Sequence, residues 1–240
     1  MGRKGAGFQG PPGIALDYDG VIANTNTVKS RWIRRHLGLD VPPWETDRTN
    51  CLRRIGKEAY LRMSPEAYGW RASLAAPPVP GVRRALRALA RHARVWVVTA
   101  RSGTMLRGCR AWMRRRGLDR FIAGYKVGGR ADGTGEGKAA LCARSGIMAL
   151  VDDDERHFSG LEKIPILKVL FKNGARGRVR VPPGARLFTR WADLLPWLLR
   201  RLEEAPARRR DRPRRAGRGA PRPPGTLRRK GAGRAALRPA

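Results

Sequence analysis

The sequence has 240 residues, of which 41% are hydrophobic, and a formal net charge of +33 at pH 7. This length suffices for one α/β domain with a small insert, or for two small domains. Its cysteines, Cys51, Cys109 and Cys142, provide neither a disulfide framework nor a C-x-x-C metal motif. No apolar run approaches the roughly 18 residues that span a bilayer. We therefore expect a cytoplasmic protein in a reducing compartment, with no membrane association.

The excess of basic residues has two explanations that the sequence leaves open. A charge of this size favours contact with polyanions such as nucleic acid. However, 43 of the 52 basic residues are Arg, and Arg, Ala, Gly and Pro all have GC-rich codons, so codon bias alone would raise the charge. Residues 205–240 carry a net charge of +12 and few large apolar side chains, so we expect a disordered tail. We also expect a flexible N-terminus over residues 1–12.

Short apolar runs alternate with helical patterns along residues 13–204. The runs predict strands at residues 14–17, 95–98, 121–127, 148–151 and 166–171. Residues 24–76 are polar and helical, with breaks predicted at Pro42-Pro43 and at Ser64-Pro65, where Ser64 would begin a new helix. Further helices are predicted at residues 82–89, 105–116 and 138–144, and after Thr189. This alternation indicates a parallel sheet covered by helices on both faces.

Polar side chains follow three of these strands. Asp17-Tyr18-Asp19-Gly20 comes directly after the first strand, Thr99 ends the second, and Asp152-Asp153 follow the fourth. Ligands of parallel sheets bind outside the carboxyl ends of the strands. We therefore expect these groups to meet at one edge, where paired carboxylates suit a hard cation and a phosphate. His157 has no ligand-like spacing to the other histidines, so we expect it at the surface or in the packing.

These motifs resemble those of the haloacid dehalogenase (HAD) superfamily of phosphohydrolases. The resemblance rests on Asp17-Tyr18-Asp19-Gly20, on Thr99, on Lys138 at a helix start and on Asp152-Asp153, and it covers residues 13–204. Within the superfamily, Val97-Val98-Thr99-Ala100-Arg101 looks most like the small-cap members related to 5′-nucleotidases. The resemblance implies a three-layer Rossmann-like core with a parallel sheet. It also implies a small, mostly helical cap inserted after the first strand, here at residues 22–78.

The resemblance also implies a role for each motif residue. Asp17 would attack phosphorus and form an aspartyl-phosphate, and Asp19 would serve as the general acid and then the general base. Thr99, Ala100 and Lys138 would bind the phosphoryl group, with Lys126 as a rival for the lysine role. Mg²⁺ would be held by Asp17, Asp152, Asp153 and the backbone carbonyl of Asp19. Arg101 is a candidate for binding the substrate.

Two functions follow as hypotheses. The first is a Mg²⁺-dependent phosphomonoester hydrolase that acts on a phosphorylated small molecule, a nucleotide or a nucleic-acid terminal phosphate. The alternative is a basic nucleic-acid-binding protein on the same scaffold, with weak or no hydrolysis and with its tail making non-specific phosphate contacts. The first hypothesis is favoured because every catalytic position holds a competent residue. The oligomeric state is left open.

Overall fold

The computed structural model describes residues 11–129, 136–162 and 164–204. Nearly all of the predicted flexible N-terminus and the whole predicted tail, residues 205–240, lie outside these ranges. Among the described residues, no helix is both long and apolar enough to cross a membrane.

A parallel sheet of six strands forms the centre of the described chain, in the order β3-β2-β1-β4-β5-β6. This confirms the predicted α/β class. The strands are β1 (Gly13–Leu16), β2 (Arg94–Thr99), β3 (Gly124–Val127), β4 (Ile147–Asp152), β5 (Leu167–Phe171) and β6 (Ala185–Phe188). Five of them were predicted to within a few residues, and β6 was missed. Its four residues include Arg186, and only part of its surface is buried, so it carries little of the apolar signal of a strand.

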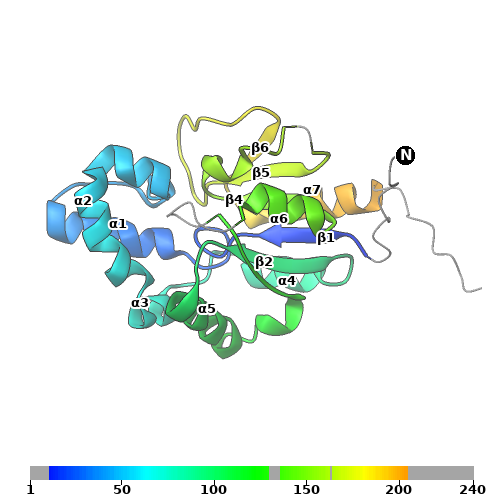
Figure 1. The fold of residues 1–240 in the computed structure, drawn as a ribbon, viewed down its shortest axis with the longest axis horizontal. Helices are drawn as coiled ribbons and strands as arrows, with labels where there is room; N and C mark the ends of the chain where they lie inside the picture. Colours follow the sequence, from blue (N-terminus) through cyan, green and yellow to red (C-terminus); the bar gives the residue numbers. More distant parts are fainter. Residues whose placement is uncertain (1–10, 130–135, 163, 205–240) are drawn as a thin grey trace, which may run out of the picture. The chain divides into compact units, whose positions relative to one another are not determined.

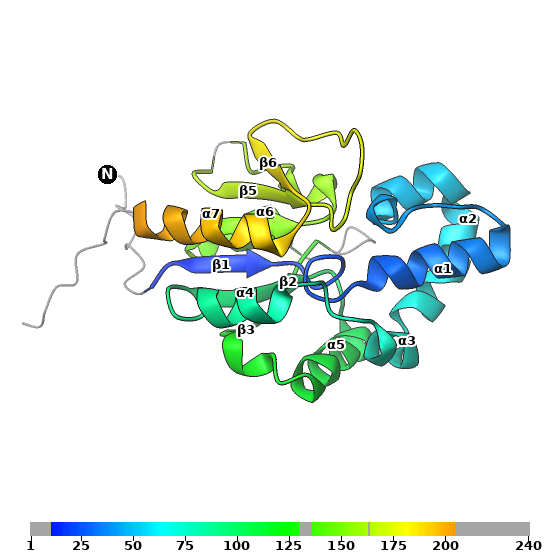
Figure 2. The same cartoon turned by 180° about the vertical axis from the view of Figure 1, so that it is seen from behind.

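Side chains alternate across the sheet, and each face packs on its own helices. Ile14 and Leu16 of β1 join the cluster formed with α4 and α7, whereas Ala15 between them faces the cluster that includes Leu141 and Cys142 of α6. Figure 1 shows α6 in front of the sheet, and Figure 2 shows α4 and α7 on the opposite face. The helices are α4 (Val82–Leu89), α5 (Gly103–Arg115), α6 (Lys138–Arg144) and α7 (Trp191–Glu204).

The chain between β1 and α4 is helical and has a small apolar cluster of its own, centred on Ile33, Cys51 and Met63. In both views its helices lie beyond the carboxyl ends of the strands (Figures 1 and 2). This helical segment contains α1 (Thr25–Leu37), η1 (Pro43–Glu45), α2 (Arg48–Tyr68) and α3 (Trp70–Ala75).

The break predicted at Ser64-Pro65 is wrong, because both residues lie inside α2. The helix is interrupted instead at Gly56, which has φ 75° and ψ 168°. Glycine tolerates this conformation because it has no Cβ. In α2, Pro65 does not mark a helix boundary, whereas Gly56 marks the interruption. The predicted third strand was also too long, because the 3-10 helix η2 (Asp119–Phe121) occupies its first residue.

Candidate active site

Asp17 begins the candidate site at the carboxyl end of β1. Its backbone N–H donates to the Val151 carbonyl at 2.9 Å, which ties the strand end to β4. The chain then turns tightly through Gly20, which has φ 75°. A Cβ at this glycine would lie 2.3 Å from Asp153 Oδ2 and 2.5 Å from Asn26 Nδ2. The turn therefore requires glycine for its conformation and for the close approach of Asp153.

Lys138 lies between two carboxylates of the site. Its Nζ donates to Asp17 Oδ1 at 2.7 Å and to Asp152 Oδ2 at 2.6 Å, and its side chain is fully buried. The rival Lys126 lies elsewhere, with its Nζ 4.4 Å from the centroid of the Trp96 ring. Of the two lysines that the sequence left open, Lys138 is the one beside the predicted nucleophile.

Asp17, Asp152 and Asp153 form a buried acidic group. One carboxylate oxygen of each lies within 4.8 Å of the others. Burial raises the pKa of Asp17 to about 6, although Lys138 opposes the shift. Burial also raises the pKa of Asp153 above its ordinary value, against the effect of Lys29 and with the help of Asp17. Two neighbouring carboxyls are therefore hard to ionise together.

This donor set fits Mg²⁺. Magnesium prefers carboxylate and water oxygens, and the group offers three buried carboxylates with no soft ligand among them. A cation there would also favour the ionised forms of Asp17 and Asp153, whose pKa values burial and the neighbouring carboxylates raise. The side chain of Asp19 is not part of this group, and a ligand role for its backbone carbonyl stays a prediction.

Asp19 and Arg101 form a bidentate ion pair next to the acidic group. Arg101 Nε and one terminal nitrogen donate to the two carboxylate oxygens at 2.9 and 2.8 Å. The other terminal nitrogen donates to Ser73 Oγ of α3 at 2.6 Å. Burial acts to raise the pKa of Asp19, but Arg101, with smaller contributions from Lys29 and Thr25, outweighs it and holds that pKa below its ordinary value. The sequence predicted Arg101 at the site, but not its partner.

Thr99 and Ala100 lie at the end of β2. Thr99 is fully buried, and its hydroxyl oxygen accepts from the Arg101 backbone N–H at 3.2 Å. The Thr99 carbonyl accepts from the Gly128 N–H at 3.0 Å, which connects β2 to the chain after β3. Because the strands are parallel, Thr99 and Ala100 lie at the same edge of the sheet as Asp17 and Asp152.

The structure adds polar contacts that the sequence reasoning missed. His157, expected at the surface or in the packing, is buried, and its ring nitrogen Nδ1 lies 2.9 Å from Asp152 Oδ1, a contact that the sequence did not predict. His157 and Lys138 together lower the pKa of Asp152, against the effect of burial. Asn26 of α1 donates to Asp153 Oδ2 at 2.7 Å. No motif points to these partners: Asn26 reaches Asp153 from a distant segment, and His157 reaches back to Asp152, which lies 5 residues earlier in the chain.

The helical segment between β1 and α4 is tied to the sheet by two further contacts. Lys172, directly after β5, donates to Asp47 Oδ2 at 2.7 Å, and both side chains are buried. Thr49 donates to Asp154 Oδ1 at 2.8 Å. Asp47 also caps α2 by accepting from the Asn50 N–H. The start of α2 is thus held over the edge where the acidic group lies.

Comparison with known proteins identifies the fold. No protein-family model matches the sequence, and no curated protein is found as a relative. A haloacid dehalogenase-like protein of unknown function from Agrobacterium tumefaciens is 18% identical, with a TM-score of 0.53 over 81% of this chain and 100% of that one. The hydrolase YfnB from Bacillus subtilis, solved with magnesium, is 10% identical, with a TM-score of 0.52 over 78% and 98% of the two chains.

A HAD family hydrolase from Deinococcus radiodurans, solved with bound phosphate and sodium, is also similar. It is 15% identical, with a TM-score of 0.50 over 78% of this chain and 95% of that one. At these identities the similarity establishes the fold alone. The fold of this chain is that of the HAD-superfamily hydrolases.

Proposed function

We propose that the protein is a Mg²⁺-dependent phosphomonoester hydrolase that works through an aspartyl-phosphate. The observation that carries this proposal is the buried lysine shared by two carboxylates: Lys138 contacts Asp17 and Asp152 at 2.7 and 2.6 Å. A third carboxylate, that of Asp153, lies beside them. A nucleophilic carboxylate, a fixed cation and a donor set for a hard metal ion are the parts that phosphoryl transfer needs. Two proteins of the same fold, solved with magnesium and with phosphate, support this choice.

In the first step, a carboxylate oxygen of Asp17 attacks phosphorus and the bond from phosphorus to the alcohol oxygen breaks. Asp19 gives its proton to that leaving oxygen. Lys138, the Thr99 hydroxyl and the Ala100 backbone N–H bind the phosphoryl oxygens and offset the charge that develops on them. Arg101 donates to both carboxylate oxygens of Asp19, which favours the ionised form, so proton donation requires Arg101 to release the carboxylate when the substrate binds.

In the second step, water attacks the phosphorus of the aspartyl-phosphate. Asp19 accepts the proton of that water, the bond from phosphorus to the Asp17 oxygen breaks, and phosphate leaves. Magnesium held by Asp17, Asp152 and Asp153 would neutralise charge on the phosphoryl oxygens. Among the described groups, Lys138 supplies a positive charge in contact with Asp17 throughout.

We further propose that residues 22–78 act as a cap that covers the site and selects the substrate. The contacts of Asp47 with Lys172 and of Thr49 with Asp154 support this role, because they hold the start of α2 over the sheet edge. Exclusion of water by such a cover strengthens electrostatic contacts within the site. The proposed substrates are nucleotides, phosphorylated small molecules or nucleic-acid terminal phosphates, in the cytoplasm.

The test is phosphate release from a panel of mononucleotides, sugar phosphates and 5′- or 3′-phosphorylated oligonucleotides, with Mg²⁺ or with EDTA. We expect Mg²⁺-dependent release that is lost in Asp17→Asn. Asp40→Asn is the matched control, because Asp40 is exposed in the loop after α1. Release that is equal in wild type and Asp17→Asn would contradict the proposed mechanism.

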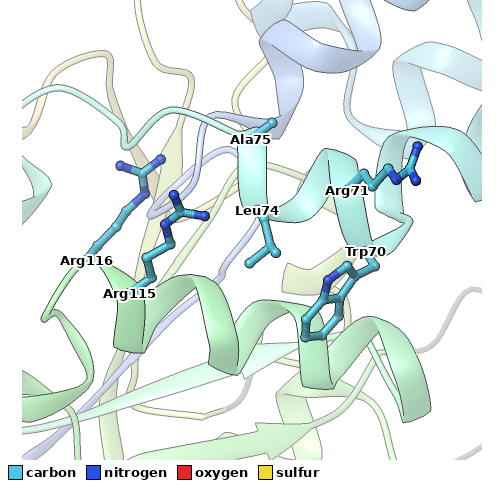
Figure 3. A pocket seen from close by; sticks show the side chains of 6 residues that line it. All are labelled: Trp70, Arg71, Leu74, Ala75, Arg115 and Arg116. Atoms are coloured by element: carbon cyan, nitrogen blue, oxygen red, sulfur yellow. The ribbon is translucent and has the colours of Figure 1, made fainter.

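A second candidate function, nucleic-acid binding, is favoured by a groove between α3 and the end of α5. Trp70 and Leu74 come from α3, and Arg115 and Arg116 from the end of α5 (Figure 3). The side chain of Trp70 is 49% exposed. Exposed aromatic rings stack on bases, and arginines contact phosphates. Binding of a single-stranded oligonucleotide that weakens with salt and weakens further in Trp70→Ala would support this function, and unchanged binding in that variant would exclude the groove.

A further inference from the structure

Lys29 of α1 is a buried cation that the proposed reaction does not use. Only 2% of its surface is exposed. Its Nζ lies 5.8 Å from the centroid of the Tyr68 ring, and it has no hydrogen-bond or ion-pair partner among the described residues. A buried ammonium without such a partner is unfavourable for folding. Packing alone would be better served by an uncharged side chain of the same length.

The surroundings of Lys29 place it at the candidate active site. Burial acts to lower the pKa of Lys29, and Tyr68, Asp153 and Asp19 outweigh it and raise that pKa, so all three lie near its ammonium. Each of the two carboxylates already accepts from another side chain, Asp153 from Asn26 and Asp19 from Arg101. Lys29 therefore faces the acidic site without being paired to it, and its charge is available to a further anion.

A second cation lies on the same side of the site. The guanidinium carbon of Arg101 is 5.0 Å from the centroid of the Tyr68 ring and 4.8 Å from that of Tyr18. Tyr68 thus lies close to both Arg101 and Lys29. The two cations lie on the side of Asp19, the residue proposed to protonate the leaving oxygen, so they are near the alcohol part of a bound ester.

We propose that Lys29, with Arg101 near it, binds a second anionic group on the leaving alcohol of the substrate. The protein then prefers phosphomonoesters whose alcohol also carries a carboxylate or another phosphate. This inference rests on the proposed function and names its substrate class. An alcohol without a second anion would leave Lys29 with no hydrogen-bond or ion-pair partner among the described residues and the substrate, and unpaired buried groups are a strong basis for rejecting a substrate.

The test compares pairs of substrates that differ in the second anion. The carboxylate pair is 3-phosphoglycerate and glycerol 3-phosphate, and the phosphate pair is adenosine 3′,5′-bisphosphate and adenosine 5′-monophosphate, with products separated by chromatography. In wild type we expect kcat/KM to be at least about 30-fold higher for the substrate with the second anion in one of the two pairs. The pair that shows this preference identifies the second anion as a carboxylate or a phosphate. Ratios near one in both pairs would overturn the inference.

Lys29→Met should bring the preference ratio close to one. The matched control is Lys57→Met, the same substitution at an exposed lysine of α2, which should keep the wild-type ratio. A ratio within one variant does not depend on the fraction of folded enzyme. A purely structural counter-ion role for Lys29 predicts the opposite result: Lys29→Met lowers the denaturation midpoint and leaves the ratio unchanged.

Calorimetry with Asp17→Asn separates failure of this inference from failure of the proposed function. Binding of 3-phosphoglycerate and glycerol 3-phosphate, and of the two adenosine phosphates, is measured in Asp17→Asn and in the double variant that also carries Lys29→Met. If wild type releases no phosphate but Asp17→Asn still binds the substrates with a second anion more tightly, and Lys29→Met removes that preference, the anion site is supported and the phosphatase is contradicted. Phosphate release without any binding preference would support the phosphatase and overturn the anion site.

Discussion

Replacing Lys138 with methionine tests whether this lysine holds the site together. The change removes hydrogen bonds of 2.7 and 2.6 Å and leaves the buried carboxylates of Asp17 and Asp152 without their shared cation. Removing one partner of a buried ion pair costs about 3–5 kcal/mol. With a guanidinium m-value of roughly 4 kcal/mol/M, the unfolding midpoint in EDTA should fall by about 1 M.

Lys126→Met is the matched control for this experiment. Lys126 is half-buried and lies over the Trp96 ring at 4.4 Å, and such a contact contributes about 1 kcal/mol or less when it is partly exposed. The control should therefore shift the midpoint by roughly a quarter as much as Lys138→Met. It should also retain phosphate release, whereas Lys138→Met should lose it.

The pH dependence gives a second measurement on the same pair of variants. Without Lys138, the pKa of Asp17, which burial already raises to about 6, should rise further, and the pKa of Asp152 should rise from its lowered value. A carboxyl whose pKa is higher in the folded than in the unfolded chain destabilises the folded state as pH rises. The loss of stability in Lys138→Met relative to wild type should therefore grow as pH rises above about 6, the pKa of Asp17 in folded wild type. Equal losses in the two variants, or a deficit independent of pH, would refute the reasoning.

Three further predictions concern the turn, the contact between α2 and the sheet, and the cysteines. Gly20→Ala should destabilise the fold by at least about 2 kcal/mol and abolish phosphate release, because its Cβ would lie 2.3 Å from Asp153 Oδ2; wild-type stability in denaturation would contradict this. Lys172→Met should speed amide hydrogen exchange at the start of α2, because it breaks the buried pair with Asp47; unchanged exchange would show that the pair does not anchor the helix. The cysteines, all buried, should react with a thiol reagent near pH 8 only on unfolding, and burial raises the pKa of Cys51 to about 11. Rapid labelling of folded protein would contradict that prediction.

The sheet and the strand-end residues were predictable because both depend on local patterns. Apolar runs identified β1, β2 and β4, and parallel topology then brought Asp17, Thr99 and Asp152 to one edge. The short strand β6 escaped because it lacks such a run. A motif match also selected Lys138, and the structure shows that Lys138 contacts Asp17 whereas Lys126 lies over the Trp96 ring.

The partners of the motif residues were not predictable. His157 on Asp152, Asn26 on Asp153 and Arg101 on Asp19 are contacts between segments far apart in the sequence or around a turn. The contact of Asn26 depends on how the helical segment packs on the sheet edge, whereas those of His157 and Arg101 depend on the paths of the chain after β4 and β2. The buried position of Lys29 was not predictable either, because nothing in the sequence distinguishes it from a lysine on a solvated helix face.

The most direct test of the central claim is to trap the covalent intermediate. Wild-type protein with Mg²⁺ is mixed with an accepted phosphomonoester, quenched in acid within the first turnover, digested and analysed by mass spectrometry. The account predicts one phosphoryl group on Asp17, absent in Asp17→Asn and in samples quenched before substrate is added. Turnover with no phosphoryl group on Asp17, or with the group on another residue, would contradict it.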